Sequence, residues 1–288
     1  MTVATVGFVV HCTRPQAATA AKEAVTWLAD RGHHARVVLP DADEIGLAEW
    51  GCRQEGFPVG LDLVVSIGGD GTMLRAMHLV VAYGVPVLGV SMGRLAYLTV
   101  VEPEQLTDAL EAFLAGRHRI ESRMTLAVTI DAPSGSVANG SYPACNEVVA
   151  EKPSSGHTVH VSVDINGSFF TSYAADGLIV ATPTGSTAYS LSARGPIISP
   201  THRALLLTPV APHMLFDRSL VFDASEEVRV EVIDERPAAL TIDGVELGML
   251  QRGDSVTCSA GATDARLVTL EPRNFYRILK TKFGLADR

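Results

Sequence analysis

The sequence predicts an α/β N-terminal domain followed by a β-rich, sandwich-like C-terminal domain. Up to about residue 105, short apolar runs alternate with segments of helical periodicity, which is typical of a largely parallel sheet covered by helices. From about residue 120, short segments of alternating polarity replace that pattern and favour a multi-stranded sandwich. We therefore predict an α/β domain over residues 1–120, a β-rich domain over 121–270, and a helix within 271–288 that returns to the first domain.

The apolar runs of the N-terminal half are its predicted strands. They cover residues 6–10, 35–39, 61–67 and 85–90. Apolar residues between positions 21 and 28 follow the i, i+3, i+4, i+7 spacing that gives a helix one apolar stripe to lay on the sheet. Gly32 ends this helix, because glycine readily adopts the left-handed cap conformation. A further helix is predicted from Pro103, since proline suits the first helical position.

The C-terminal half shows strand periodicity. Residues 159–165 place four β-branched residues on one face, and Asn166-Gly167 then supplies a hairpin turn. Similar segments predict further strands at 126–130, 178–181, 205–208, 228–232 and 265–270.

Composition and charge exclude several classes of protein. The 288 residues are 47% hydrophobic and 19% charged, which is enough apolar material for two modest cores. The chain lacks a basic start followed by an apolar core, and no stretch approaches the roughly 18 apolar residues of a membrane helix. We therefore expect a cytoplasmic protein with no membrane partner. The net charge of −9 argues against nucleic acid as a partner.

Neither the cysteines nor the histidines form a metal-binding pattern. The four cysteines lie far apart and are expected to be buried, reduced thiols. His157 and His160 stand three apart in a predicted strand, so their side chains point to opposite faces. We predict no metal ligands within the chain.

Gly68-Gly69-Asp70-Gly71-Thr72 stands where the strand at 61–67 gives way to a helix expected from Met73. Glycine permits backbone angles closed to other residues and lets main-chain N–H groups approach a phosphate, and the helix start adds partial positive charge. Asp70 is negatively charged like the phosphates, so we expect its carboxylate to have another role, such as accepting a proton from an attacking hydroxyl or ordering a magnesium ion. The motif therefore predicts phosphoryl transfer. Its structural alternative is a tight turn with a solvent-facing aspartate.

Two later segments predict a nucleoside site. Asn146-Glu147 places an amide beside a carboxylate, a pair able to bind both hydroxyls of a ribose. Over residues 176–189, a strand leads into a dense group of hydroxyls, glycine and an aromatic ring. Such a loop can surround a base and its sugar, or its hydroxyls can cap their own backbone.

These segments resemble the NAD kinases, which phosphorylate the 2′-hydroxyl of the adenosine ribose of NAD to give NADP. The resemblance rests on residues 68–72, 146–147, 176–189, 208–213 and 275–279. The first motif also occurs in lipid kinases and, with serine for threonine, in phosphofructokinases. The later segments are more specific to NAD kinases.

The resemblance implies a site between an α/β domain and a β-rich domain. It assigns Asp70 as the base and places the loop of Gly68, Gly69, Gly71 and Thr72 against the donor phosphates. The substrate-binding residues that it implies are Asn146, Glu147, Asp176, Thr187, Ala188, Tyr189, Ser192 and His213. Members of the family use ATP or polyphosphate with Mg²⁺ or Mn²⁺ and assemble as homodimers or homotetramers.

The chain departs from the family pattern at positions that read the substrate. Ser91 and Ala96 replace the usual Asn and Gly, and Val245 replaces a Gln. Arg194 stands where Gly is common. Its guanidinium could block part of the dinucleotide path, hold an acceptor's phosphate or carboxylate in a two-pronged bond, or lie on the surface.

Three hypotheses follow from these segments. The first is a kinase that converts NAD to NADP. The second is a kinase of the same type that phosphorylates a ribose hydroxyl of another nucleotide or nucleoside-derived metabolite, for which Arg194 would bind an anionic group. The third is a non-catalytic nucleotide-binding regulator, against which the retained Asp70 argues because a sensor needs no general base.

Overall fold

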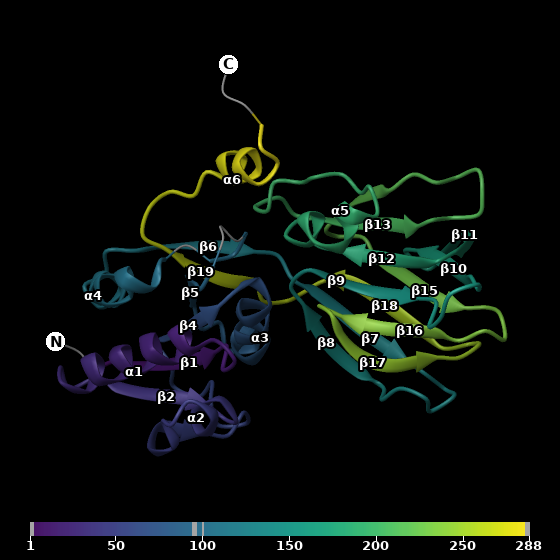
Figure 1. The fold of residues 1–288 in the computed structure, drawn as a ribbon. Helices are drawn as coiled ribbons and strands as arrows, with labels where there is room; N and C mark the ends of the chain where they lie inside the picture. The colour runs from purple at the N-terminus through teal and green to yellow at the C-terminus, as the bar shows by residue number, and fades with distance from the viewer. Residues whose placement is uncertain (1–2, 94–96, 100, 286–288) are drawn as a thin grey trace. The chain divides into compact units, whose positions relative to one another are not determined.

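The computed structural model describes residues 3–93, 97–99 and 101–285 of the chain. These form two compact units, one of residues 1–122 with 265–288 and the other of residues 123–264. The first unit is α/β and the second is built of strands (Figure 1), so the predicted fold class is confirmed.

A seven-stranded sheet forms the centre of the first unit, in the order β3-β2-β1-β4-β5-β19-β6. Its strands are β1 Thr5–Val10, β2 His34–Val38, β3 Gly51–Cys52, β4 Leu63–Gly68, β5 Val87–Ser91, β6 Arg119–Arg123 and β19 Ala265–Thr269. The pairs from β3 across to β19 are parallel, as the sequence predicts. Parallel strands end at a common edge, so the loops that follow β1, β4 and β5 lie together.

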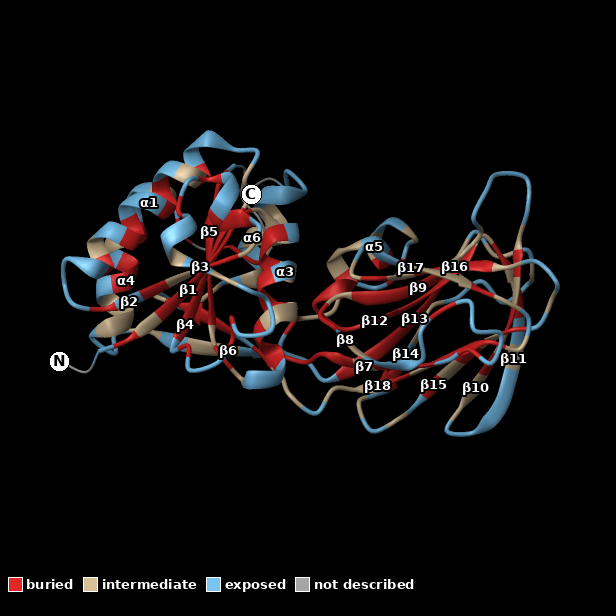
Figure 2. Cartoon of the chain, turned by 90° about the horizontal axis from the view of Figure 1, so that it is seen from below, coloured by how far each residue is buried: buried red, intermediate tan, exposed pale blue. Residues whose placement is uncertain are grey.

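Helices cover both faces of this sheet. The α-helices are α1 Pro15–Ala29, α2 Asp41–Glu44, α3 Asp70–Val80, α4 Leu106–Leu114 and α6 Phe275–Lys282, and the 3₁₀ turns are η1 Ala48–Trp50, η2 Val81–Tyr83 and η3 Pro103–Gln105. Figure 2 shows α1 and α4 on one side of the sheet and α3 on the other. The buried stripe of α1 includes Ala21, Val25 and Leu28, which pack in one cluster with Phe8 of β1.

Two six-stranded antiparallel sheets form the second unit. One has the order β11-β10-β15-β18-β7-β8 and the other β14-β13-β12-β9-β16-β17. The first contains β7 Leu126–Asp131, β8 Gly140–Ala144, β10 Val159–Ile165, β11 Ser168–Ala175, β15 Val228–Val232 and β18 Ser255–Ala260. The second contains β9 Glu147–Glu151, β12 Gly177–Ala181, β13 Ala204–Val210, β14 Leu220–Asp223, β16 Ala238–Ile242 and β17 Val245–Leu250. The short η4 Gly185–Thr187 and α5 Tyr189–Ser192 follow β12.

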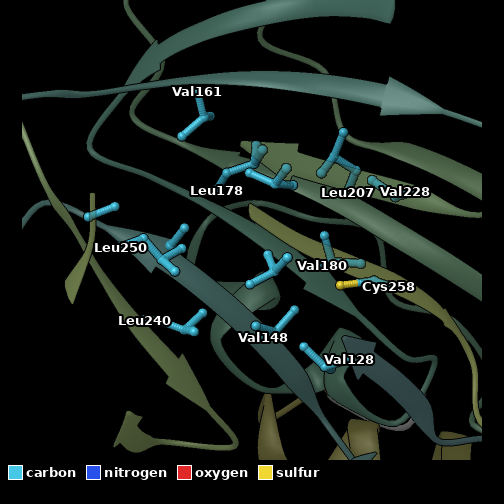
Figure 3. Packing of buried hydrophobic residues seen from close by; sticks show 14 of the residues in the cluster. Val128, Val148, Val161, Leu178, Val180, Leu207, Val228, Leu240, Leu250 and Cys258 are labelled. Carbon is cyan, nitrogen blue, oxygen red and sulfur yellow. The ribbon is translucent and has the colours of Figure 1, made fainter. Parts of the chain in front are cut away.

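A single apolar cluster joins these two sheets. Val128 and Val161 come from one sheet, and Val180 and Leu240 come from the other (Figure 3). The predicted turn between β10 and β11 is present, with Asn166 and Gly167 at φ values of 51° and 75°. The unit is therefore a sandwich whose inner faces supply its core.

Three details differ from the sequence-based expectation. The strand at residues 265–269, expected in the sandwich, pairs instead with β5 in the first unit. Helix α3 begins at Asp70, three residues earlier than expected from Met73. The glycines Gly68, Gly69 and Gly71 adopt no left-handed conformation, so their backbone freedom is not what the loop uses.

All four cysteines are free, and Cys145 and Cys258 are buried as predicted, whereas Cys12 and Cys52 are only half-buried. Within the described part of the chain, no helix has the length and apolar character that crossing a membrane requires.

The core of the sandwich allows a direct test of its packing. Leu240 is fully buried, so Leu240→Ala should lower the free energy of unfolding by about 2–5 kcal/mol through lost burial and a residual cavity. Val245, which is 57% exposed in the same sheet, is the control, and Val245→Ala should change stability by less than about 0.5 kcal/mol. Urea unfolding of both variants measures the difference. Equal effects would contradict the packing described.

Candidate functional site

The loop between β4 and α3 carries the glycine-rich motif, and its glycines have different tasks. A Cβ on Gly68 would lie 2.2 Å from Oγ1 of Thr72, so any larger residue would collide with the helix start. A Cβ on Gly69 or Gly71 would meet nothing within 4 Å. Gly68 therefore permits close packing, while Gly69 and Gly71 keep the approach to the backbone open.

Asp70 is the first residue of α3, and its carboxylate is held by a distant loop. Oδ2 accepts a hydrogen bond from the N–H of Tyr97 over 3.0 Å, and Oδ1 accepts one from the N–H of Leu98 over 2.9 Å. Negative charge is also favoured at a helix N-terminus. An ionised carboxylate has about four acceptor sites, so these bonds fix the group while each oxygen can still accept a hydroxyl.

A cavity of about 570 Å³ opens beside this motif. Its lining includes Gly69, Gly71 and Thr72, the cations Arg14 and Arg75, and the acids Asp41 and Glu44. The cavity combines a helix start with two guanidinium groups, which is suited to phosphates.

Both cations are held in place. Arg75 donates to both carboxylate oxygens of Asp41, over 2.8 and 2.5 Å, and to the carbonyl of Val10. Arg14 donates to the carbonyl of Met92 over 2.5 Å. Next to them, burial, followed by the charge of Asp41, raises the pKa of Cys12 to about 12, so this thiol is not a nucleophile at neutral pH.

In the second unit, Asn146 and Glu147 are oriented by an acid in the turn between β16 and β17. The carboxylate of Asp243 accepts hydrogen bonds from the N–H groups of Cys145, Asn146 and Glu147 over 2.6, 2.7 and 2.9 Å. Three consecutive peptide groups are thereby fixed at the start of β9. Asp243 itself lies at φ 48°, in the left-handed region that Asp tolerates better than most residues.

Glu147 is buried and partly unsatisfied. Burial, followed by the charge of Asp243, raises the pKa of Glu147 from 4.5 to about 8. A hydrogen bond from the backbone N–H of Tyr189 acts in the opposite direction. The Oε2 atom of Glu147 is buried and forms no hydrogen bond within the described residues. A buried carboxyl oxygen of this kind fits a hydroxyl donor from a ligand.

The hydroxyls after β12 build the loop itself. Thr182 donates to the carbonyl of Cys145, Ser186 to that of Pro183 and Thr187 to that of Thr184. Ser186 and Thr187 thus cap the backbone of their own loop, whereas Thr182 ties the loop to the segment before β9. That the segment surrounds a base and its sugar stays a prediction. A Cβ on Gly185 would lie 2.1 Å from the carbonyl oxygen of Asn146, so this glycine seats the loop against the Asn146–Glu147 pair.

The remaining predicted residues lie around this loop at different depths. Asp176 forms an ion pair with Lys152 over 2.7 Å, and the exposed Tyr189 donates its hydroxyl to Glu151 over 3.1 Å. Burial, followed by the charge of Glu151, raises the pKa of Tyr189. Ala188 is half-buried, and Ser192 and His213 are exposed.

The positions that depart from the family pattern also have structural explanations. Arg194 is exposed at φ 64°, a conformation in which glycine is the unstrained residue. Val245 is exposed, and the Oγ of the buried Ser91 donates to the carbonyl of Gly93 over 3.2 Å. Ala96 lies outside the described residues.

Sequence patterns alone did not identify three of the groups described above. Arg75 follows Gly71 by four residues on α3 and so lies on the same helix face, a spacing that could have indicated it. Asp243 stands in an Asp-Gly turn, but nothing local links that turn to Asn146. Arg14 reaches the cavity only through the folding of β1 beside β4.

An acid at a helix start beside a cavity that holds two arginines, together with a buried carboxyl group in the second unit, is the set of groups expected of a phosphotransferase that acts on an alcohol group. Residues 6–118 match the ATP-NAD kinase N-terminal domain, and residues 145–270 match the ATP-NAD kinase C-terminal domain. The chain belongs to the NAD kinase family.

Several relatives are similar over almost the whole chain. The NAD kinase of Heliobacterium modesticaldum is 40% identical over 279 residues, covering 96% of this chain and 98% of that protein. The NAD kinase of Moorella thermoacetica is 36% identical over 280 residues, covering 96% and 88%. The crystal structure of yeast NADH kinase complexed with NADH matches with a TM-score of 0.90 and 26% identity, covering 99% of this chain and 89% of that one. An NAD kinase from Archaeoglobus fulgidus in complex with ATP shares the fold, with a TM-score of 0.72 and 21% identity over 98% of both chains.

The raised pKa of Glu147 predicts a pH-dependent stability. Between about pH 4.5 and 8 the folded chain keeps this proton and the unfolded chain releases it, so the free energy of unfolding should fall as the pH rises through this range. Glu147→Gln removes this titration, so the free energy of unfolding of the variant should fall less steeply with pH than that of the wild type. The two slopes should differ by an amount on the order of 1.36 kcal/mol per pH unit. Urea unfolding at pH 5 and pH 8 measures both slopes.

The exposed Glu246 supplies the control for this measurement, because Glu246→Gln makes the same substitution in the same unit without altering a buried group. Its stability should follow the wild-type pH dependence. If Glu147→Gln and wild type gave the same slope, the buried protonated state of Glu147 would be excluded.

Proposed function

We propose that the protein transfers a phosphoryl group from ATP, or from polyphosphate, to the 2′-hydroxyl of the adenosine ribose of NAD and so forms NADP. The observation that carries this proposal is the Asp70 carboxylate, held by two backbone N–H groups at the start of α3 beside a cavity lined by Arg14 and Arg75. The relatives named as NAD kinases support NAD as the acceptor.

On the donor side, the phosphates occupy the cavity lined by Gly69, Gly71 and Thr72. Arg14 and Arg75 compensate their charge there, and Arg75 is aimed by its two-pronged pair with Asp41. ATP is the preferred donor, in keeping with the family's description as ATP-NAD kinases.

The divalent ion, Mg²⁺ or Mn²⁺, enters with the donor. Asp41, an acid lining the cavity, is committed to Arg75 and the N–H of Val10, and both oxygens of Asp70 accept backbone N–H groups. Glu44 is the other acid among the residues that line the cavity, and one such carboxylate fits an ion bound mainly by donor phosphates and water. Such an ion would offset charge on the transferred group.

On the acceptor side, Glu147 and Asn146 hold the hydroxyls of the adenosine ribose. The buried Oε2 of Glu147 accepts one hydroxyl, and the backbone of both residues is fixed by Asp243. Asp176, Ala188, Tyr189, Ser192 and His213 surround the nucleoside, and Thr187 contributes through the shape of its loop rather than its hydroxyl. Asp70 accepts the proton of the attacking hydroxyl as the phosphoryl group is transferred.

We further propose a homo-oligomer, either dimer or tetramer, in the cytoplasm. Exposed aromatic and aliphatic side chains gather where β11 lies near the segment after β13, as expected of a subunit contact. Phe169 is 67% exposed and Leu215 fully so, and the rings of Phe170 and Phe216 meet edge to face at 6.0 Å. The four free cysteines fit a reducing compartment.

Asp70→Asn tests the proposed base. The amide keeps the shape but cannot accept the proton, so kcat for NADP formation from ATP and NAD should fall by about 10²–10⁴. Asp43→Asn on α2 is the matched control, because Asp43 is exposed, and it should retain wild-type kcat. Near-normal turnover by Asp70→Asn would remove Asp70 from the base role.

Arg194→Gly distinguishes NAD from an anionic acceptor of another kind. At φ 64° glycine is unstrained, so the variant should be more stable by about 0.5–1 kcal/mol and its KM for NAD should be unchanged or lower. If Arg194 instead binds an anionic group of the acceptor, affinity for that acceptor would fall by about 1.5–3 kcal/mol. A mass-resolved phosphorylation screen of NAD, NADH and nucleoside acids, with wild type and variant, decides between them.

A further inference from the structure

The segment between β19 and α6 contacts the residue that holds Asp70. The N–H of Tyr97 donates to Oδ2 of Asp70 over 3.0 Å, and the carbonyl oxygen of the same residue accepts a hydrogen bond from Nη2 of Arg273. All three residues belong to the same compact unit. The N–H of Tyr97 thus contacts an acid, and its carbonyl contacts a guanidinium cation.

Arg273 is suited to this contact by its charge and its burial. The side chain is half-buried beside a cavity of about 460 Å³ that is also lined by Thr99 and Glu271. A hydrogen bond from a guanidinium to a carbonyl is stronger than one between neutral groups, and partial burial limits competition from water. The contact therefore fixes the orientation of the peptide group that joins Tyr97 to Leu98.

A second cation from α6 holds the ring of the same residue. Nζ of Lys282 lies 4.1 Å from the centre of the Tyr97 ring, within the range of a cation–π interaction. Burial, followed by the charge of Asp70, raises the pKa of the Tyr97 hydroxyl, so the ring remains a neutral phenol at neutral pH. Backbone and ring of one residue are thus held by two cations from the C-terminal segment.

We propose that Arg273 is a positioning residue for Asp70, assisted by Lys282. The Tyr97 carbonyl and the Leu98 N–H belong to one planar peptide group, so by holding that carbonyl Arg273 aims the Leu98 N–H at the carboxylate, and so fixes the direction in which Asp70 meets the acceptor hydroxyl. This inference rests on the proposed role of Asp70 as the base. A displaced base slows the chemical step while donor binding in the cavity lined by Arg14 and Arg75 is unaffected.

Arg273→Ala should therefore lower kcat by roughly tenfold to a hundredfold, with the KM for ATP unchanged. Arg273→Lys should retain more of kcat than Arg273→Ala, because lysine keeps the charge but loses the planar fork. Arg277→Ala is the matched control, since Arg277 is an exposed cation of α6, and it should keep the wild-type kcat. A folded Arg273→Ala with wild-type kcat would overturn the inference.

The same substitution in an Asp70→Asn background separates positioning from a general loss of structure. With no base to aim, Arg273→Ala should cause little further loss of kcat. If Arg273 only stabilises the fold, the substitution would reduce kcat by the same factor in both backgrounds, and the inference would be wrong. Failure of the base role itself is recognised separately, by normal turnover of Asp70→Asn alone.

Lys282→Met provides a second variant should Arg273→Ala not fold, since methionine keeps apolar cover on the ring. It should lower kcat severalfold in the wild-type background and leave kcat of Asp70→Asn unchanged. Thermal melting followed by circular dichroism verifies that each variant is folded. Equal losses in the two backgrounds would count against positioning through Tyr97.

Discussion

The parallel pairing of β1, β4 and β5 is the constraint on which the phosphate-facing part of the molecule depends. Because these strands run in one direction, the segments that follow them meet at one edge of the sheet although they are far apart in the sequence. Their backbones are joined there, since the N–H of His11 donates to Ile67 and the N–H of Met92 donates to Gly68. Arg14 reaches the cavity beside the glycine-rich loop only through this arrangement.

Carboxylates that accept backbone N–H groups organise both candidate binding regions. Asp70 accepts two such bonds and Asp243 accepts three. A carboxylate can orient several peptide groups at once because it offers about four acceptor sites. The backbone of Asn146 and Glu147 is thus oriented by Asp243, and Val245 is exposed beside the same turn.

The extent to which sequence predicted structure varies from element to element. The strands β1, β2, β4 and β5 of the first sheet begin and end within two residues of their predicted bounds, because apolar runs mark buried strands directly. The short β3 and the more polar β6 have no such run and were not predicted. The start of α3 was placed too late, since glycine disfavours helices and two glycines lie in its neighbourhood at 69 and 71. The strand at 265–269 was assigned to the wrong sheet, because its polarity pattern carries no information about which strand it pairs with.

Local periodicity and residue chemistry are enough to predict the two-unit fold class and the chemical character of two motifs, the acid among glycines at Asp70 and the amide beside a carboxylate at Asn146–Glu147. Both are properties of short segments. The folded chain is needed to see that the hydroxyl of Thr182 donates to the carbonyl of Cys145, that Asp243 fixes the Asn146–Glu147 backbone, and that Arg273 contacts Tyr97. Each of these bonds joins groups brought together by packing, and a residue's type does not record which distant backbone group it will meet.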